Sequence, residues 1–198
     1  MGKALSGWGL FAVLVAAVTA LTGFTVRDGI DLGAIDALIR VTARMSLVLF
    51  VAAFTARPLA QRWPQGWTRW TLRNRRYIGL AFAWSHGLHA IGIALLWQYD
   101  PASFAAKATP VTLIFGGFAY VLLALMAATS FRPTAALIGP LAWRILHLAG
   151  SYYIALIFLN SYLGRAAVDA AYLPLALIIL GALVLRLVPR LRRRRAAA

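Results

Sequence analysis

Long apolar stretches make up most of this chain, and short polar segments separate them. Six stretches are long enough to cross about 30 Å of hydrocarbon as helices: residues 8–24, 35–54, 77–97, 111–128, 141–160 and 172–188. The segments between them carry turn-forming and helix-breaking pairs such as Asp28-Gly29, Asp100-Pro101 and Arg132-Pro133. The pattern predicts an all-α integral membrane protein, a six-helix transmembrane bundle forming a single domain over residues 1–198.

Composition supports a membrane protein and limits its chemistry. Hydrophobic residues make up 62% of the chain, which leaves too little polar surface for a soluble globule. The net charge of +15 comes from arginines that flank apolar runs, so we expect membrane lipid rather than nucleic acid as the partner. Cysteine is absent, which excludes iron–sulfur clusters and thiolate-ligated heme. A redox role would therefore need a bound cofactor.

The charges alternate between the connections and predict an orientation. Cytoplasmic loops of membrane proteins hold the excess of Lys and Arg. Here the basic residues gather in the second connection, the fourth connection and the tail, whereas the acidic residues lie in or beside the first, third and fifth connections. We therefore expect a multi-pass protein of the bacterial inner membrane with both termini cytoplasmic and residues 189–198 as a basic cytoplasmic tail. The first span could be a cleaved signal peptide, but its length favours a retained helix.

The longest predicted connection, residues 55–76, is too short to fold as a nucleotide-binding unit, and no Gly-rich phosphate motif is present. We therefore expect no flavin or NAD domain in this chain. An electron-transfer protein of this kind would need a separate donor, either a reductase or a membrane quinol.

Two of the three histidines lie at membrane depth in the third predicted span. His86 and His89 are three residues apart on one helix face, roughly 14 and 18 Å from the cytoplasmic boundary. Buried imidazoles are rare in hydrocarbon and usually functional. The pair could provide an axial heme ligand with a hydrogen-bonding neighbour, or a shared metal or proton site. Alternatively, each ring could bond a polar group on a neighbouring helix.

Other candidate ligands are weaker. His147 begins the fifth span beside Trp143, where it could be a heme ligand or a simple interfacial anchor. Arg44 lies deep enough in the second span to bind an internal anion such as a heme propionate, while Arg40 is better explained by pairing with Asp36. Met45 and Met126 could offer thioether ligands, although methionines in apolar helices usually only pack.

Several short motifs together resemble a known family. Arg75-Arg76-Tyr77 followed by His89 resembles the third helix of the ferric-reductase-like transmembrane superfamily, especially the heme-binding membrane subunits of bacterial methionine-sulfoxide reductase systems. Further similarity lies in Thr42 to Leu59 with its closing Pro58-Leu59, in Ala128-Thr129-Ser130, and in Gly139, Trp143, Leu146-His147 and Tyr153. The likeness covers residues 42–162.

The resemblance implies six helices that hold b-type heme between histidines of the third and fifth helices, here His89 and His147. In the family a second histidine follows on the fifth helix about thirteen residues later, where this chain has Asn160, level with His89. Arg76 would be level with His147, so His86 is displaced from that level by about 15 Å. A simple bis-histidine site is therefore not expected, and iron could be five-coordinate, take a methionine or be absent.

The leading hypothesis is a b-type cytochrome that passes electrons across the inner membrane to an outer-side acceptor. It would hold one or two hemes through His89 or His86, with His147 as a second ligand or second site and Arg44 as a propionate partner. It could be the membrane subunit of a ferric-reductase-like oxidoreductase. One alternative is a heme-free relative acting as a scaffold or assembly partner. A weaker one is a histidine-based proton or metal transporter, since no inverted repeat is seen.

Overall fold

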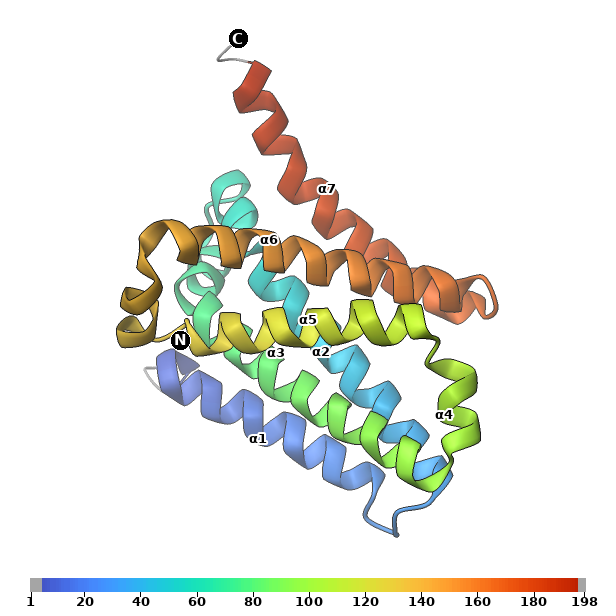
Figure 1. Cartoon of the computed structure of the whole chain (residues 1–198). Helices are drawn as coiled ribbons and strands as arrows, with labels where there is room; N and C mark the ends of the chain where they lie inside the picture. The colour runs from blue at the N-terminus through green and yellow to red at the C-terminus, as the bar shows by residue number, and fades with distance from the viewer. Residues whose placement is uncertain (1–4, 196–198) are drawn as a thin grey trace.

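The computed structural model describes residues 5–195, and within them the chain is all helical (Figure 1). The prediction of an all-α fold is confirmed. The helices, in chain order, are α1 (Gly7–Thr25), α2 (Leu32–Arg62), α3 (Gly66–Tyr99), α4 (Pro101–Lys107), α5 (Pro110–Ala128), α6 (Arg132–Ala166), the short 3₁₀ helix η2 (Ala170–Tyr172) and α7 (Leu173–Arg195).

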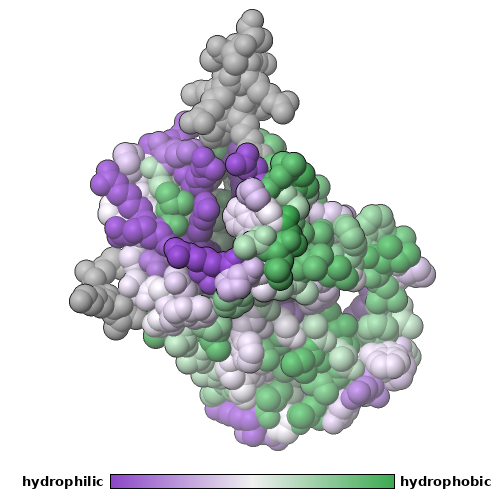
Figure 2. All heavy atoms as spheres, turned by 60° about the vertical axis from the view of Figure 1, so that its left-hand side comes forward, coloured by the Kyte–Doolittle hydropathy of each residue, from purple (hydrophilic) through white to green (hydrophobic). Residues whose placement is uncertain are grey.

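Six segments of the described chain are long and apolar enough to cross a membrane: α1, α2, α3, α5, α6 and residues 170–188 at the last helix. Each stretch selected from the sequence lies within or almost within one of them. Large apolar side chains face outward along these helices, for example Ile114 and Phe118 of α5. Figure 2 shows the resulting broad apolar surface beside hydrophilic patches. Outward apolar side chains are those that lipid would cover.

Successive long helices run up and down the bundle. The Gly7 N–H donates to Asn74 Oδ1 at 2.9 Å, and Trp84 Nε1 donates to Thr19 Oγ1 at 3.0 Å, so α1 runs parallel to α3 (Figure 1). Close contacts place α2 against α3 and α5 against α6. The bundle therefore has two ends, with the turns at Trp63–Gln65 and 129–131 at one end and the segment 26–31, α4 and η2 at the other.

The charges separate between these two ends. The first end, here called the basic end, carries the arginines on either side of the α2–α3 turn and Arg132. The second, the acidic end, carries the five acidic residues, Asp28, Asp31, Asp36, Asp100 and Asp169, of which Asp36 contacts Lys107 at 3.3 Å. The predicted tail of residues 189–198 begins as a continuation of α7, and its last three residues lie outside the described part.

The predicted long connection of residues 55–76 is largely helical, because α2 continues through Pro58 to Arg62. Proline normally weakens a helix interior, since it has no N–H for the carbonyl four residues earlier, here that of Phe54. In this fold Arg186 of α7 donates from Nη1 to the Phe54 carbonyl oxygen at 2.9 Å, and its guanidinium lies 4.2 Å from the Phe54 ring centroid. A distant arginine thus satisfies the carbonyl that Pro58 leaves without a helical partner.

Helix α6 contains a sharp bend at Gly139, whose φ of 74° lies in the left-handed region that glycine tolerates best. Pro140 follows and starts the second, longer part of the helix. Residues before the bend include Leu137, which is 84% exposed. The bend therefore separates a short first segment from the longer part of α6, which contains the predicted span 141–160.

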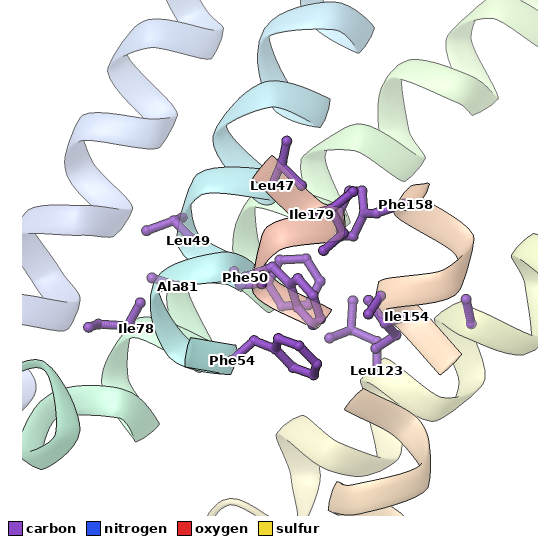
Figure 3. Packing of buried hydrophobic residues seen from close by; sticks show 14 of the residues in the cluster. Leu47, Leu49, Phe50, Phe54, Ile78, Ala81, Leu123, Ile154, Phe158 and Ile179 are labelled. Atoms are coloured by element: carbon purple, nitrogen blue, oxygen red, sulfur yellow. The ribbon is translucent and has the colours of Figure 1, made fainter. Parts of the chain in front are cut away.

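Aromatic rings fill the middle of the bundle between α2, α3 and α6. The Phe50 ring centroid lies 5.1–5.4 Å from those of Phe54, Phe82 and Phe158. Figure 3 shows the α2 rings facing Leu123 and Ile154. Large rings, rather than close backbone contact, join α3 to α6 at this level. These packed rings lie beside the histidines of α3.

Candidate functional site

His86 and His89 lie side by side on α3, as the sequence predicts. Their ring centroids are 5.2 Å apart and the rings are 21° from parallel. The spacing of three residues on one helix explains this arrangement. The surroundings of the two rings differ, so the groups that each ring can bind differ as well.

The side chain of His89 is held by α2. Its Nδ1 lies 3.1 Å from the carbonyl oxygen of Ile39, which can only accept, so this nitrogen carries the proton and donates. The Thr42 hydroxyl donates to the Leu38 carbonyl at 2.6 Å, and its oxygen therefore also accepts from Nδ1–H of His89, at 3.1 Å. The lone pair of the neutral ring is then on Nε2. A metal-binding histidine usually has this arrangement.

The contact depends on close packing of α2 against α3. A Cβ at Gly92, one turn beyond His89, would overlap the side chains of Leu38 and Ile39. Two turns earlier on α3, Ser85 accepts a hydrogen bond from Ser46 of α2 at 2.9 Å, and both side chains are fully buried. Small and hydroxyl side chains at this seam let the backbones approach, as is common between membrane helices. Gly92 therefore sets the distance at which His89 reaches Ile39.

His86 lies in an aromatic environment. Its ring stacks on Tyr120 of α5 at 4.8 Å and lies 5.6 Å from the Phe158 ring of α6. The Tyr120 hydroxyl donates to the His86 carbonyl at 3.3 Å. Nδ1 of His86 is fully buried and has no hydrogen-bond partner among the described residues. An orphaned imidazole nitrogen inside a bundle is costly and points to a missing partner.

His147 is separate from this pair and is already engaged. The Thr129 hydroxyl donates to the Leu125 carbonyl at 2.7 Å, so its oxygen accepts from Nε2–H of His147 at 3.0 Å. The His147 ring also stacks on Trp143 at 4.3 Å. It precedes Phe158, the α6 ring nearest His86, by eleven residues, or about 16 Å along the helix. His147 and His86 therefore cannot bind the same metal ion.

Asn160, the expected level partner of His89, does not belong to the inner face of α6. Its side chain is exposed, whereas Ile154, Phe158 and Tyr162 are buried on the face toward the bundle. Residues four apart share a helix face, so 154, 158 and 162 form one stripe from which position 160 points away. The side chain that α6 presents near His86 is a phenylalanine.

Arg44 lies with a second arginine near the acidic end. The guanidinium carbons of Arg44 and Arg165 are each 5.8 Å from the centroid of the Tyr172 ring. Neither arginine has a carboxylate within salt-bridge distance among the described residues, whereas Arg40 lies 4.0 Å from Asp36 as predicted. The neighbouring Tyr162 hydroxyl is buried and lacks a partner. Both arginines are exposed, and together with the buried Tyr162 hydroxyl they form a candidate anion site.

The two candidate methionines are packed elsewhere. Met45 lines a small apolar pocket of about 270 Å³ between α1 and α2, together with Leu14 and Val18. Met126 packs against Gly150, where an added Cβ would lie 2.6 Å from its sulfur. The described residues also contain no cluster of three or more His, Asp or Glu side chains able to hold a metal ion. The metal ligands that the described residues offer are therefore individual histidine side chains rather than a cluster.

Sequence reasoning missed Thr42, Arg165 and Tyr162. Thr42 is one turn from Leu38 and Ile39 on α2, but nothing in the local pattern tells that it faces His89. Arg165 stands near the end of an apolar stretch, where an arginine is common at a membrane boundary. The signal that could have identified Arg165 is the shortage of acidic residues around it, since only Asp169 is near in sequence.

Comparison with known proteins gives two matches. Residues 41–159 match the model of the family described as "Ferric reductase like transmembrane component". The chain is also 34% identical over 193 residues to the protein-methionine-sulfoxide reductase heme-binding subunit MsrQ of Rhodospirillum rubrum, covering 94% of this chain and 91% of that protein. No solved structure matches the chain.

Proposed function

The chain belongs to the ferric reductase-like transmembrane family, and from this premise we propose that it is a heme-binding membrane protein that passes electrons across the bilayer. The name of the Rhodospirillum rubrum relative as a heme-binding subunit supports the cofactor. Heme iron would supply the one-electron redox chemistry, which no cysteine-based centre can provide in this chain.

The observation that carries this proposal is the fixed tautomer of His89. The Ile39 carbonyl and Thr42 hydroxyl hold its Nδ1–H, which leaves Nε2 as the nitrogen with a lone pair. A carbonyl partner also makes a histidine ligand more basic and fixes its ring plane. We propose that His89 is the residue that would bind the heme iron. His86, with its orphaned Nδ1, would be the neighbouring hydrogen-bonding group rather than the ligand.

The residues at the acidic end fit the rest of a heme molecule. Heme b carries two carboxylates, and Arg44 and Arg165 are cations without carboxylate partners in the described structure. Arginine binds carboxylates strongly because its planar fork can donate two parallel hydrogen bonds. We therefore propose that Arg44 and Arg165 would neutralise these carboxylates and that the Tyr162 hydroxyl would donate a hydrogen bond to one of them.

The histidine count supports one heme rather than two. His147 lies near the basic end, and its Nε2–H is committed to Thr129, so it is better explained as a structural anchor of α6 than as a ligand. The buried rings of Phe50 and Phe82 fill the interior between the level of His147 and the level of the histidine pair. We infer that His89 holds a single heme toward the acidic end.

The charge separation supports an orientation. If the basic end faces the cytoplasm of a bacterial inner membrane, the heme lies toward the outer face, near an outer-side acceptor. The donor would then be a separate reductase or membrane quinol at or near the cytoplasmic side. The relative is named as a subunit, which supports a partner protein for this chain as well.

The visible spectrum of protein purified from heme-replete cells tests the proposal. We expect a Soret band in the oxidised protein and sharp α and β bands after reduction with dithionite, with heme close to one per chain. A colourless protein would instead support the heme-free scaffold, the alternative favoured by the engagement of His147 with Thr129. A preparation with two hemes per chain would contradict the single site.

A further inference from the structure

The side chains around His89 determine which second ligand a heme iron held by His89 could bind. This inference rests on the proposed function, and it concerns the second axial position of a heme held by His89. In proteins that position is filled by histidine, methionine, cysteine, tyrosine or, when no side chain reaches it, by a small exogenous ligand. Each residue type can be located in this structure.

No second imidazole is available. His86 lies on the same helix as His89 with a nearly parallel ring, so both rings approach a ligand from the same side. His147 is about 16 Å along α6 from the level of His86 and donates to Thr129. Position 160, where the family pattern has a histidine, carries an exposed asparagine here.

Among residues 5–195, which the structure describes, no thioether or thiolate is available either. Met45 lines the pocket between α1 and α2, away from the α2–α3 seam that holds His89. Met126 lies against Gly150, one turn past His147 on α6 and about 12 Å along the helix from Phe158. The chain has no cysteine, and Lys107 contacts Asp36 at the acidic end.

The facing helices present rings instead. On α6 the side chain nearest the pair is Phe158, 5.6 Å from His86 between ring centroids. On α5 it is Tyr120, whose hydroxyl is used by the His86 carbonyl. Tyr162 is the remaining oxygen donor, but its ring continues the stack of Phe158 toward Tyr172 and the two arginines. None of these side chains provides the second iron ligand that a histidine would provide.

We propose that the heme iron of this protein has one protein ligand, His89, and an open position that takes a small exogenous ligand. A neutral diatomic molecule such as carbon monoxide would bind the ferrous iron. The apolar rings of Phe158 and Phe82 favour such small ligands over a charged group. The protein would thus differ from an electron carrier whose iron is closed by two histidines.

Spin state and ligand binding test this proposal. We expect the wild-type ferric protein to give a high-spin electron paramagnetic resonance signal near g = 6, and the ferrous protein to shift its Soret band with carbon monoxide. A low-spin ferric spectrum with no carbon monoxide shift would overturn the open position while leaving heme binding intact. A colourless protein would overturn the proposed function itself.

Two matched variants locate the open side. Phe158→His should convert the iron to the low-spin state and abolish the carbon monoxide shift, because it places an imidazole on the inner face of α6. Asn160→His, the substitution that restores the family residue, should leave both signals as in the wild type, because position 160 faces outward. Conversion by Asn160→His but not by Phe158→His would overturn the assignment.

Discussion

Nδ1 of His89 lies 3.1 Å from the Ile39 carbonyl oxygen, a contact between the second half of α3 and the first half of α2. It fixes which nitrogen of the ring remains available and which way the ring faces. The contact requires the close packing of α2 against α3 that the absence of a side chain at Gly92 permits. The proposed heme binding depends on this contact between His89 and Ile39 more than on the number of histidines in the chain.

Removing the Thr42 hydroxyl should lower the affinity of the protein for heme. Thr42→Val keeps the shape but deletes one of the two acceptors for His89 Nδ1–H. Changes of such supporting groups typically lower metal affinity about 10–100-fold, so we expect roughly a tenfold faster transfer of heme to an acceptor such as apomyoglobin. Thr55→Val is the matched control, since Thr55 on the same helix bonds only the Val51 carbonyl. Equal effects of both variants would contradict the role of Thr42.

Adding a methyl group at Gly92 should destabilise the protein. Gly92→Ala places a Cβ against Leu38 and Ile39, and overpacking of this kind costs about 1–3 kcal/mol. Thermal unfolding in detergent, followed by tryptophan fluorescence, should show a lower midpoint. Gly87→Ala on the same helix meets nothing within 4 Å and should unfold like the wild type. A wild-type midpoint for Gly92→Ala would show that the seam is looser than described.

The bond between Arg186 and the Phe54 carbonyl should matter only while Pro58 is present. Arg186→Met leaves that buried carbonyl without its donor, which costs about 1–3 kcal/mol. In a Pro58→Ala background the alanine N–H can bond the carbonyl, so the same substitution should cost less. Unfolding of the four proteins forms a double-mutant cycle. A coupling energy of zero would contradict this pairing.

Neutralising the cations near Tyr172 should lower the reduction potential of the heme. Arg44→Gln and Arg165→Gln each remove a positive charge that favours the electron-rich ferrous state, so we expect the midpoint to fall by tens of millivolts. Potentiometric titration of the α band measures it. Arg27→Gln at the same end removes a cation already paired with Asp28 at 3.0 Å, and should change the potential far less. An unchanged midpoint in both test variants would remove these arginines from the site.

The apolar spans could be predicted because hydrophobicity along the chain directly reports what lipid must cover. The continuation of α2 through Pro58 could not be, because it depends on Arg186, which follows Phe54 by 132 residues. His86 and His89 stood out as imidazoles at membrane depth. Their different roles depend on Ile39, Thr42 and Tyr120, which are contacts made only when the helices pack.

Position 160 shows a second limit. The distance along the helix from His147 places Asn160 near the level of the histidine pair, but level does not determine which face a side chain takes. The buried stripe of Ile154, Phe158 and Tyr162 identifies the inner face and leaves Asn160 exposed. The expected partner of His89 is therefore absent for two reasons, the residue type and its direction.

Replacement of the proposed ligand with a cavity tests the central claim most directly. The Soret absorbance per chain should be largely lost in His89→Gly and should return when imidazole is added, because the free molecule can occupy the space of the side chain. His147→Gly should retain the wild-type absorbance. Full absorbance in His89→Gly, together with its loss in His147→Gly, would contradict the account and place the heme at the basic end.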